Sequence, residues 1–368
     1  MRHLLILGTA ALLAGSAIAD VQVSERRALK DTLKAGGQQS GNRTGTGQPP
    51  GRTGEQPLID ASGLEYFINT DITFTTSSSA SGAASEASYT AAVNADTSGG
   101  GSTSTTLTDS FDGYGARCVS LTGGTGPCVS GGGGDGPVEY IMYNQNGVAA
   151  LECNGRQVVT PSQTIGPFSV TRKIFVPASG EFIRWMDIVT NTSGASASLN
   201  LISSNNLGSD AGTTIVTSSD SDATAEAADT WLTSFQAFSG STSSDVRLGH
   251  VFQGAGAPVP MAGISFVNGD DNPFWRYAMT VGAGQTQIIV NFATGQPTRA
   301  EAAAAATALA AAPSTECMTQ TEIDQIANFA LNGPPPPNVL EVPTASTYGL
   351  IALGLLLSVA AFGVLRRR

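Results

Sequence analysis

Charged side chains are scarce in this chain of 368 residues, at 13% of the total, and aromatic side chains reach only 7%. Small residues, above all Gly, Ser, Thr and Ala, dominate instead. This composition is unlike that of a cytosolic enzyme and is typical of many short strands joined by small-residue turns. We therefore expect a mainly β fold, an antiparallel β-sandwich of the Ig-like kind or a larger one.

Basic residues are also few, because 18 Lys and Arg stand against 29 Asp and Glu, for a formal net charge of -11. Four of the basic residues, Arg2 and Arg366–Arg368, lie at the chain ends. The body between them has no Lys or Arg cluster to neutralise a phosphate backbone, so nucleic-acid binding through a basic patch is disfavoured.

Histidine occurs only twice, which excludes a histidine-rich metal site. After the first residues one histidine remains, His250 in RLGHVFQG, and no G-x-S-x-G motif accompanies it. We expect a structural or surface histidine there. No phosphate loop, dinucleotide fingerprint or kinase motif occurs either. Paired carboxylates need no histidine for acid–base work, so the acidic clusters have to be considered.

Three clusters of Asp residues occur in the chain. We expect each to be a solvated turn, since Asp is an ordinary turn residue. They are Asp109 and Asp112 in LTDSFDGYG, Asp210, Asp220 and Asp222 in GSDAGTTIVTSSDSD, and Asp270 and Asp271 in NGDDNPFW. Calcium is the next interpretation for Asp210, Asp220, Asp222, Asp270 and Asp271, because oxygen ligands on loops suit it, although the spacing is not that of an EF-hand. We expect no other cofactor and no catalytic residue.

Two aromatic residues, Trp275 and Tyr277, follow Asp270 and Asp271 closely. An aromatic face beside polar groups could form a sugar platform. Packing in the core is the favoured alternative for both rings.

Cysteine occurs four times, and the absence of a C-x-x-C pair makes a zinc site less favoured than disulfides. Four residues allow three pairings. We favour Cys118 with Cys128, which bracket the turn-rich VSLTGGTGP, and Cys153 with Cys317, which would tie the sandwich to the helical tail. Four unpaired buried thiols are the alternative.

The first 19 residues have the pattern of a secretory signal peptide. A short basic start precedes the apolar run Leu4–Ala14, and Ala17-Ile18-Ala19 forms a small-x-small site before Asp20. We expect cleavage between Ala19 and Asp20. A retained anchor is the weaker alternative, because the apolar run is too short to span a bilayer.

The other end carries an uncharged apolar stretch, Gly349–Leu365, followed at once by Arg366, Arg367 and Arg368. Its length is at the lower limit of about 17 residues for a single transmembrane helix. The three arginines would stay on the cytoplasmic side and leave the body outside. A buried core helix is the alternative, but such a helix seldom lacks a polar face over this length.

A short motif stands directly before this stretch, at residues 342–349. Val342-Pro343 and Ser346-Thr347-Tyr348 resemble the VPEPSTY form of the PEP-CTERM family, and Pro343-Thr344, Ser346 and Gly349 resemble the IPTLSxWG form of the IPTL-CTERM family. The expected sorting motif consists of Val342, Pro343, Thr344, Ser346, Tyr348 and Gly349. The resemblance covers about the last 27 residues. It implies a membrane-embedded exosortase-like partner that cuts near the motif and passes the body to the cell surface or matrix.

Composition divides the rest of the chain. Residues 20–57 contain little that could form a core and are expected to be disordered, residues 58–297 form the sandwich body, and residues 333–341 are a Pro-rich spacer. Between the last two, residues 298–332 carry two capping boxes, Thr298–Glu301 and Thr319–Glu322, and we expect a C-terminal helical hairpin there.

Several segments within the body have the pattern of strands. Expected strands cover Leu64–Thr75, Glu139–Tyr143, Ser169–Val176, Phe182–Thr190, Ala197–Ser203, Trp275–Val281 and Gln285–Phe292. Two hairpins are expected among them. One pairs residues 169–176 with 182–190, and the other pairs residues 275–281 with 285–292.

The favoured function is a non-enzymatic surface or matrix protein, made as an inner-membrane precursor with its body in the periplasm and serving adhesion or exopolysaccharide association. A secreted glycan-active enzyme with paired carboxylates is the first alternative. A calcium-stabilised structural module is the second.

Overall fold

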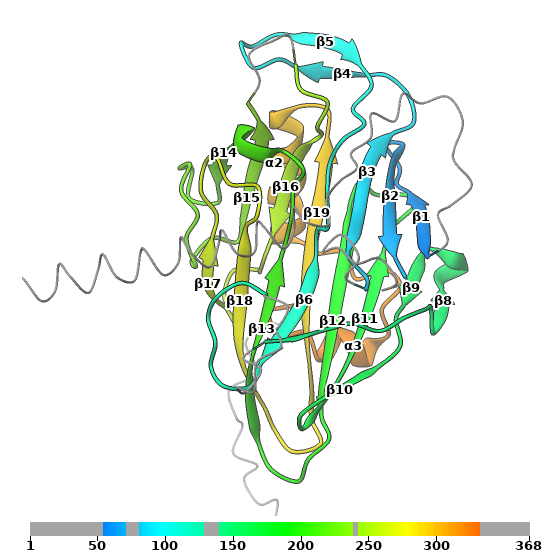
Figure 1. Ribbon diagram of the computed structural model, residues 1–368, viewed down its shortest axis with the longest axis vertical. Helices are drawn as coiled ribbons and strands as arrows, with labels where there is room; N and C mark the ends of the chain where they lie inside the picture. Colours follow the sequence, from blue (N-terminus) through cyan, green and yellow to red (C-terminus); the bar gives the residue numbers. More distant parts are fainter. Residues whose placement is uncertain (1–53, 71–80, 129–139, 238–241, 332–368) are drawn as a thin grey trace, which may run out of the picture. The chain divides into compact units, whose positions relative to one another are not determined.

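The structure is a computed structural model, and it describes residues 54–70, 81–128, 140–237 and 242–331 (Figure 1). The signal peptide with its Ala19–Asp20 junction, the spacer, the sorting motif and the apolar stretch before Arg366 all lie outside these ranges. No helix within them has the length and apolarity needed to cross a bilayer.

A nine-stranded antiparallel sheet forms the larger layer, and its order is β14-β15-β16-β19-β12-β11-β9-β8, with β10 also paired to β11. Its strands are β8 (Ala150–Glu152), β9 (Gln157–Val159), β10 (Gln163–Ile165), β11 (Phe168–Phe175), β12 (Ile183–Asn191), β14 (Thr213–Ser218), β15 (Trp231–Gln236), β16 (Arg247–Val251) and β19 (Thr286–Gln296). The expected hairpin of β11 with β12 is confirmed, since Phe168 pairs with Asn191 and Phe175 with Arg184.

A five-stranded sheet, in the order β17-β18-β13-β6-β7, faces the inner side of the larger one. It contains β6 (Ala116–Ser120), β7 (Ile141–Met142), β13 (Ala197–Ser204), β17 (Met261–Ser265) and β18 (Phe274–Val281). The expectation of a mainly β, antiparallel sandwich is thereby confirmed.

Two smaller sheets complete the body. Strands β1 (Glu55–Ile59), β2 (Leu64–Asn69) and β3 (Ala84–Tyr89) form a three-stranded sheet, and β4 (Val93–Asp96) and β5 (Ser102–Thr105) form a hairpin at one end (Figure 1). Strand β1 begins inside the segment expected to be disordered up to residue 57. Side chains of the three-stranded sheet, such as Tyr66, share the main apolar core with both large sheets.

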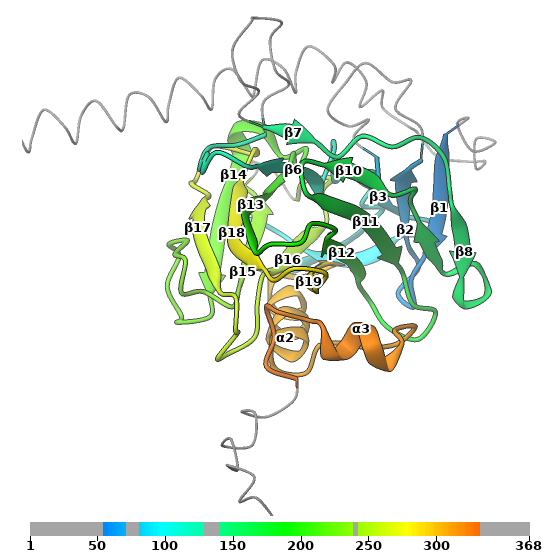
Figure 2. The same ribbon diagram turned by 90° about the horizontal axis from the view of Figure 1, so that it is seen from below.

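The alternation of side chains along each strand separates the two faces of the nine-stranded sheet. In β12, Trp185, Asp187 and Val189 point into the sandwich, whereas Met186 belongs to a second apolar cluster on the outer face. Figure 2 shows the outer face covered by helices α2 (Arg299–Ala311) and α3 (Gln320–Asp324).

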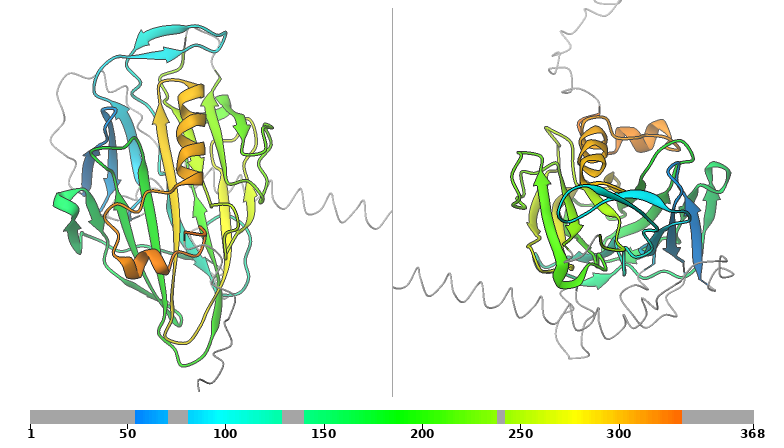
Figure 3. Two further views of the ribbon diagram at one scale, coloured as in Figure 1. Left: turned by 180° about the vertical axis from the view of Figure 1, so that it is seen from behind. Right: turned by 90° about the horizontal axis from the view of Figure 1, so that it is seen from above.

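The expected helical hairpin is present only in part. Both N-caps occur as predicted, with the Thr298 and Thr319 hydroxyls accepting from the N–H groups of Glu301 and Glu322. The second helix, however, ends at Asp324 after five residues. Beyond it the chain is extended along β19, where Ile288 N donates to Gln325 O and Ala327 N to Ile288 O. Pairing with a strand therefore overrides the helical spacing of this segment (Figure 3).

The predicted hairpin of residues 275–281 with 285–292 is wrong. Both segments are strands, but β18 pairs with β13 and β17, whereas β19 pairs with β12 and β16. The Gly282–Gly284 turn consequently carries the chain from one sheet to the other. The Asn191–Gly194 turn makes the same crossing, between β12 and β13. The strand pattern alone cannot distinguish a hairpin from such an arch, because both need apolar strands and a glycine turn.

Candidate functional site

Asp109 and Asp112 flank a buried phenylalanine in the loop between β5 and β6. Phe111 is fully buried, and its ring centroid lies 4.6 Å from that of Tyr114 and 6.3 Å from that of Tyr66. Its φ of 69° lies in the left-handed region, which costs a residue other than glycine roughly 1–2 kcal/mol. Both Asp residues remain half-buried, one on each side of this anchor.

The backbone of this loop is held at several points. Phe111 N donates to Leu207 O at 3.1 Å, Asp112 N donates to Asn206 O at 3.1 Å, and the Ser110 hydroxyl accepts from Val246 N at 3.0 Å. The two carboxylates are consequently presented from a rigid support. Such pre-organisation is what a site for chemistry requires.

Gly208 lies close to both carboxylates. A Cβ at this position would stand 3.8 Å from Asp112 Cγ and 3.9 Å from Asp109 Oδ1. Asp112 Cγ and Asp109 Oδ1 are therefore at most about 8 Å apart, a limit compatible with the separations of about 5–9.5 Å that glycosidases use. The glycine, with φ +78°, permits the left-handed backbone of this turn and places no side chain beside the carboxylates.

The structure brings a second acidic pair to the same end of the sandwich. Leu207 N donates to Asp271 O at 2.9 Å, so the segment between Asn206 and Gly208 separates the Asp109 loop from the Asp271 loop. Asp271 is buried and its Oδ1 accepts from Asn272 Nδ2 at 2.5 Å, while Asp270 is half-buried. The backbones of two of the three clusters therefore lie against the same segment, residues 206–208.

The remaining calcium candidates, Asp210, Asp220 and Asp222, do not lie together in one turn. Asp210 opens a 3-10 turn before β14, whereas Asp220 and Asp222 lie in the turn after that strand, where the Ser218 hydroxyl donates to both. No group of three or more His, Cys, Asp or Glu side chains that could hold a metal ion occurs among the described residues. The geometry therefore gives the calcium interpretation no support.

His250 is buried between the sheets, in agreement with a structural histidine. Its Nδ1 lies 2.8 Å from the Tyr114 hydroxyl and its Nε2 2.8 Å from the Ser234 hydroxyl. Burial lowers its pKa to about 3, so the ring is neutral at physiological pH. A neutral imidazole with both nitrogens hydrogen-bonded in the core is a packing element.

The sugar platform proposed for Trp275 and Tyr277 is excluded by burial, since each side chain is 1% exposed. Trp275 packs against Phe252 with ring centroids 4.8 Å apart, and the Tyr277 hydroxyl donates to Phe252 O at 2.6 Å. Both point inwards because they alternate with the outer-face residues of β18. Core packing, the favoured alternative, is confirmed.

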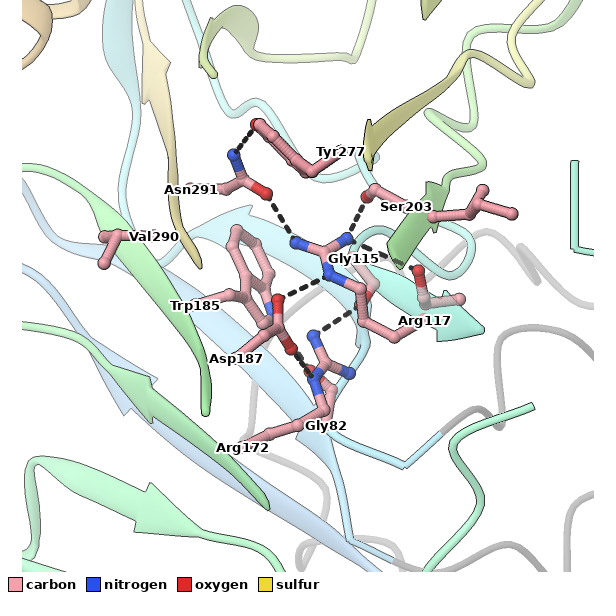
Figure 4. A network of polar contacts seen from close by, with 12 residues as sticks. Gly82, Gly115, Arg117, Arg172, Trp185, Asp187, Ser203, Tyr277, Val290 and Asn291 are labelled. Atoms are coloured by element: carbon pink, nitrogen blue, oxygen red, sulfur yellow. Dashed lines mark hydrogen bonds and ion pairs between the residues drawn. The ribbon is translucent and has the colours of Figure 1, made fainter. Parts of the chain in front are cut away.

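A charged cluster between the sheets was not anticipated from the sequence. Asp187 of β12 accepts from Arg172 Nε at 2.7 Å and from Arg117 Nε at 2.6 Å, and all three side chains are at most 2% exposed (Figure 4). Arg117 also donates to Ser203 Oγ and to Asn291 Oδ1. The signal was an Arg and an Asp on the apolar face of strands 169–176 and 182–190.

Electrostatics explain how this carboxylate stays ionised. Burial opposes its charge, but the guanidinium groups of Arg117 and Arg172 outweigh that effect and keep the pKa of Asp187 below its ordinary value. Since all three side chains are buried, the cluster links the two sheets inside the core and is not an accessible site.

Both favoured disulfides are present. Cys118 pairs with Cys128, and Cys153 pairs with Cys317, with Cα atoms 5.7 Å and 5.9 Å apart. Disulfides persist in oxidising compartments, so the folded body belongs in the periplasm or outside the cell.

Comparison with known proteins gave matches among solved structures only; no family model and no curated protein matches the chain. The Slr1438 protein of Synechocystis shares 11% identity over 68% of this chain and 99% of its own, with a TM-score of 0.37. A galactose mutarotase-like protein of Lactobacillus casei shares 9% over 66% and 99%, with a TM-score of 0.35. A polysaccharide lyase shares 12% over 63% of this chain, which spans only 32% of that enzyme, with a TM-score of 0.33.

The expectation of a non-enzymatic body is corrected by these matches. Two of these descriptions name proteins of carbohydrate chemistry, a polysaccharide lyase and a galactose mutarotase-like protein. At 12% identity or less they assign no residue and no substrate to this chain.

Proposed function

We propose that the chain is an exported glycan-active enzyme whose carboxylate pair is Asp109 and Asp112. The observation that carries the proposal is the placement of both carboxyl groups next to Gly208 on a hydrogen-bonded loop, with Asp112 Cγ and Asp109 Oδ1 at most about 8 Å apart. Among the described residues no metal-binding group competes for this role, and the one histidine is sealed in the core.

The chemistry needs only these two side chains. In glycoside hydrolysis one carboxylic acid protonates the leaving oxygen, while the other carboxylate activates water or attacks the anomeric carbon. The glycosidic oxygen of the substrate would lie between the two groups. The backbone hydrogen bonds of Phe111 and Asp112 fix the pair before substrate binds.

Substitution of either residue tests the assignment. Asp109→Asn and Asp112→Asn each remove an acid or base without changing side-chain shape, and we expect kcat to fall by about 10²-fold or more. Asp222→Asn is the matched control, because that residue lies in the exposed β14–β15 turn. Equal activity of Asp109→Asn, Asp112→Asn and the control would refute the assignment.

We also propose that the chain reaches the cell surface through its C-terminal tail. The motif at residues 342–349, the apolar stretch Gly349–Leu365 and the final arginines support an inner-membrane precursor cut by an exosortase-like enzyme. The two disulfides support the exported location of the body. Deletion of residues 342–368 should release the body into the medium or block maturation, and an unchanged surface fraction would contradict this part.

A further inference from the structure

A lysine and a glutamine lie on one face of neighbouring strands, on the outer side of the nine-stranded sheet. Gln157 of β9 pairs with Phe175 of β11, and Lys173 pairs with Val159, so Gln157 and Lys173 are diagonal neighbours. Residues in this relation have Cα atoms about 7–8 Å apart, within reach of two long side chains. Gln157 is fully buried and Lys173 is 13% exposed.

One carboxylate oxygen connects the two side chains. Glu152 Oε2 of β8 lies 2.8 Å from Lys173 Nζ and accepts from Gln157 Nε2 at 2.6 Å. The amine and the carboxamide nitrogen are therefore neighbours on the same oxygen. A carboxylate in this position can take a proton from the first nitrogen and pass it to the second.

A fixed cation holds the oxygen of the same carboxamide. Arg184 Nη2 donates to Gln157 Oε1 at 2.9 Å, while its Nη1 donates to Ser314 O and Glu316 O at 2.9 and 2.8 Å. Arg184 is fully buried, so the donor is pre-organised. A donor aimed at a carbonyl oxygen stabilises the oxyanion that forms when the carbonyl carbon is attacked.

We propose that Lys173 and Gln157 form an intramolecular isopeptide bond. The neutral Nζ attacks Gln157 Cδ, and the resulting oxyanion is stabilised by Arg184. Glu152 accepts the proton from Nζ and delivers it to Nε2, the Cδ–Nε2 bond breaks, and ammonia leaves. No oxidant or other reactant is consumed, and the product is one amide that joins β9 to β11.

The charges around Lys173 determine the pH dependence of this step. The charged groups that bind it are Glu152 of β8 and Glu322 of α3, while Arg184 of β12 binds the neighbouring Gln157. Burial alone would lower the pKa of Lys173, but hydrogen bonds to the two carboxylates hold it above its ordinary value. The neutral amine is thus the minor form, and cross-linking should accelerate as pH rises.

Mass spectrometry of the exported protein tests the proposal. After incubation of the folded protein at alkaline pH and reduction of its disulfides, its mass should be lower by one ammonia. A tandem spectrum should join the peptides that carry Lys173 and Gln157. An intact mass equal to that of the same processed chain without ammonia loss would overturn the proposal.

Variants separate this reaction from ammonia loss at an asparagine. Lys173→Arg and Glu152→Gln should each abolish the joined peptide. Glu322→Gln should retain it and form it faster, because it removes a carboxylate from Lys173 but keeps the α3 capping box. Mass loss that persists in Lys173→Arg would overturn the proposal.

Discussion

Arg117 of the five-stranded sheet donates its Nε–H to Asp187 Oδ2 of the nine-stranded sheet at 2.6 Å, and so joins the two layers through the core. Arg172 binds the other oxygen of the same carboxylate from within the larger sheet. Two buried cations share one buried anion. Their remaining N–H groups are used too, as Arg172 Nη1 and Nη2 donate to Ser81 O and Gly115 O.

Removal of this anion should strongly destabilise the folded protein. In Asp187→Asn the two guanidinium groups lose their counter-charge inside the core, and the free energy of unfolding should fall by about 3–5 kcal/mol. Urea unfolding measures the loss, with the exposed Asp222→Asn as control. Replacement of Arg117, Arg172 and Asp187 together by apolar residues should cost less than the single change. A loss below about 1 kcal/mol for Asp187→Asn would contradict the role of the cluster.

His250 should not titrate in the folded protein near neutral pH. Burial lowers its pKa from 6.5 to about 3, so the unfolded state binds the proton more strongly. Its contribution to stability is present above about pH 6.5 and is lost as the pH falls towards 3. If the expected cleavage after Ala19 occurs, His250 is the one histidine left, and its NMR signal is unambiguous. A ring signal that shifts with a midpoint near 6.5 would rule out this environment.

Asp60 should make stability change with pH in the opposite direction to His250. This carboxyl lies in the β1–β2 turn, and burial raises its pKa to about 6 despite hydrogen bonds from Ser62, Leu64 and Tyr66. The folded state therefore binds the proton more strongly, and the stability it supplies at low pH is lost as the pH rises through about 6. Asp60→Asn should remove this slope and raise stability at pH 8 by up to about 3 kcal/mol. Equal urea midpoints for variant and wild type from pH 4 to 8 would contradict the shift.

The two disulfides should stabilise the folded protein by different amounts. The Cys153–Cys317 bond closes a loop with a sequence separation of 164, against 10 for Cys118–Cys128. Loop entropy in the unfolded chain predicts losses of about 5 and about 3 kcal/mol when each pair is replaced by serine. Urea unfolding of both double variants gives the comparison, and a larger loss for the shorter loop would contradict it.

The fold class was predictable because alternation and turn residues are local signals. The β11–β12 hairpin, the two helix caps and both disulfides followed from short segments or simple pairing. The partner of β18 did not, because strand pairing depends on tertiary contacts that the Gly282–Gly284 turn does not encode. The short α3 has the same cause, since Ile326 and Ala327 pair with β19 in place of continuing the helix.

The candidate site could be predicted from the sequence only in part. Asp109 and Asp112 could be named as a carboxylate pair, but their relation to Gly208 and to Asp271 depends on loops far apart in sequence. The Lys173, Glu152 and Gln157 constellation depends in the same way on the register of β8, β9 and β11. Register is set by turns and packing, so spacing in the chain could not reveal it.

Glycan turnover by the mature wild-type protein tests the central claim most directly. Incubation with a panel of neutral, acidic and amino-sugar polysaccharides should release reducing ends from at least one of them, with the anomer of the first product followed by NMR. The account predicts turnover that Asp109→Asn or Asp112→Asn reduces by about 10²-fold or more. No release of reducing ends from any polysaccharide would contradict it.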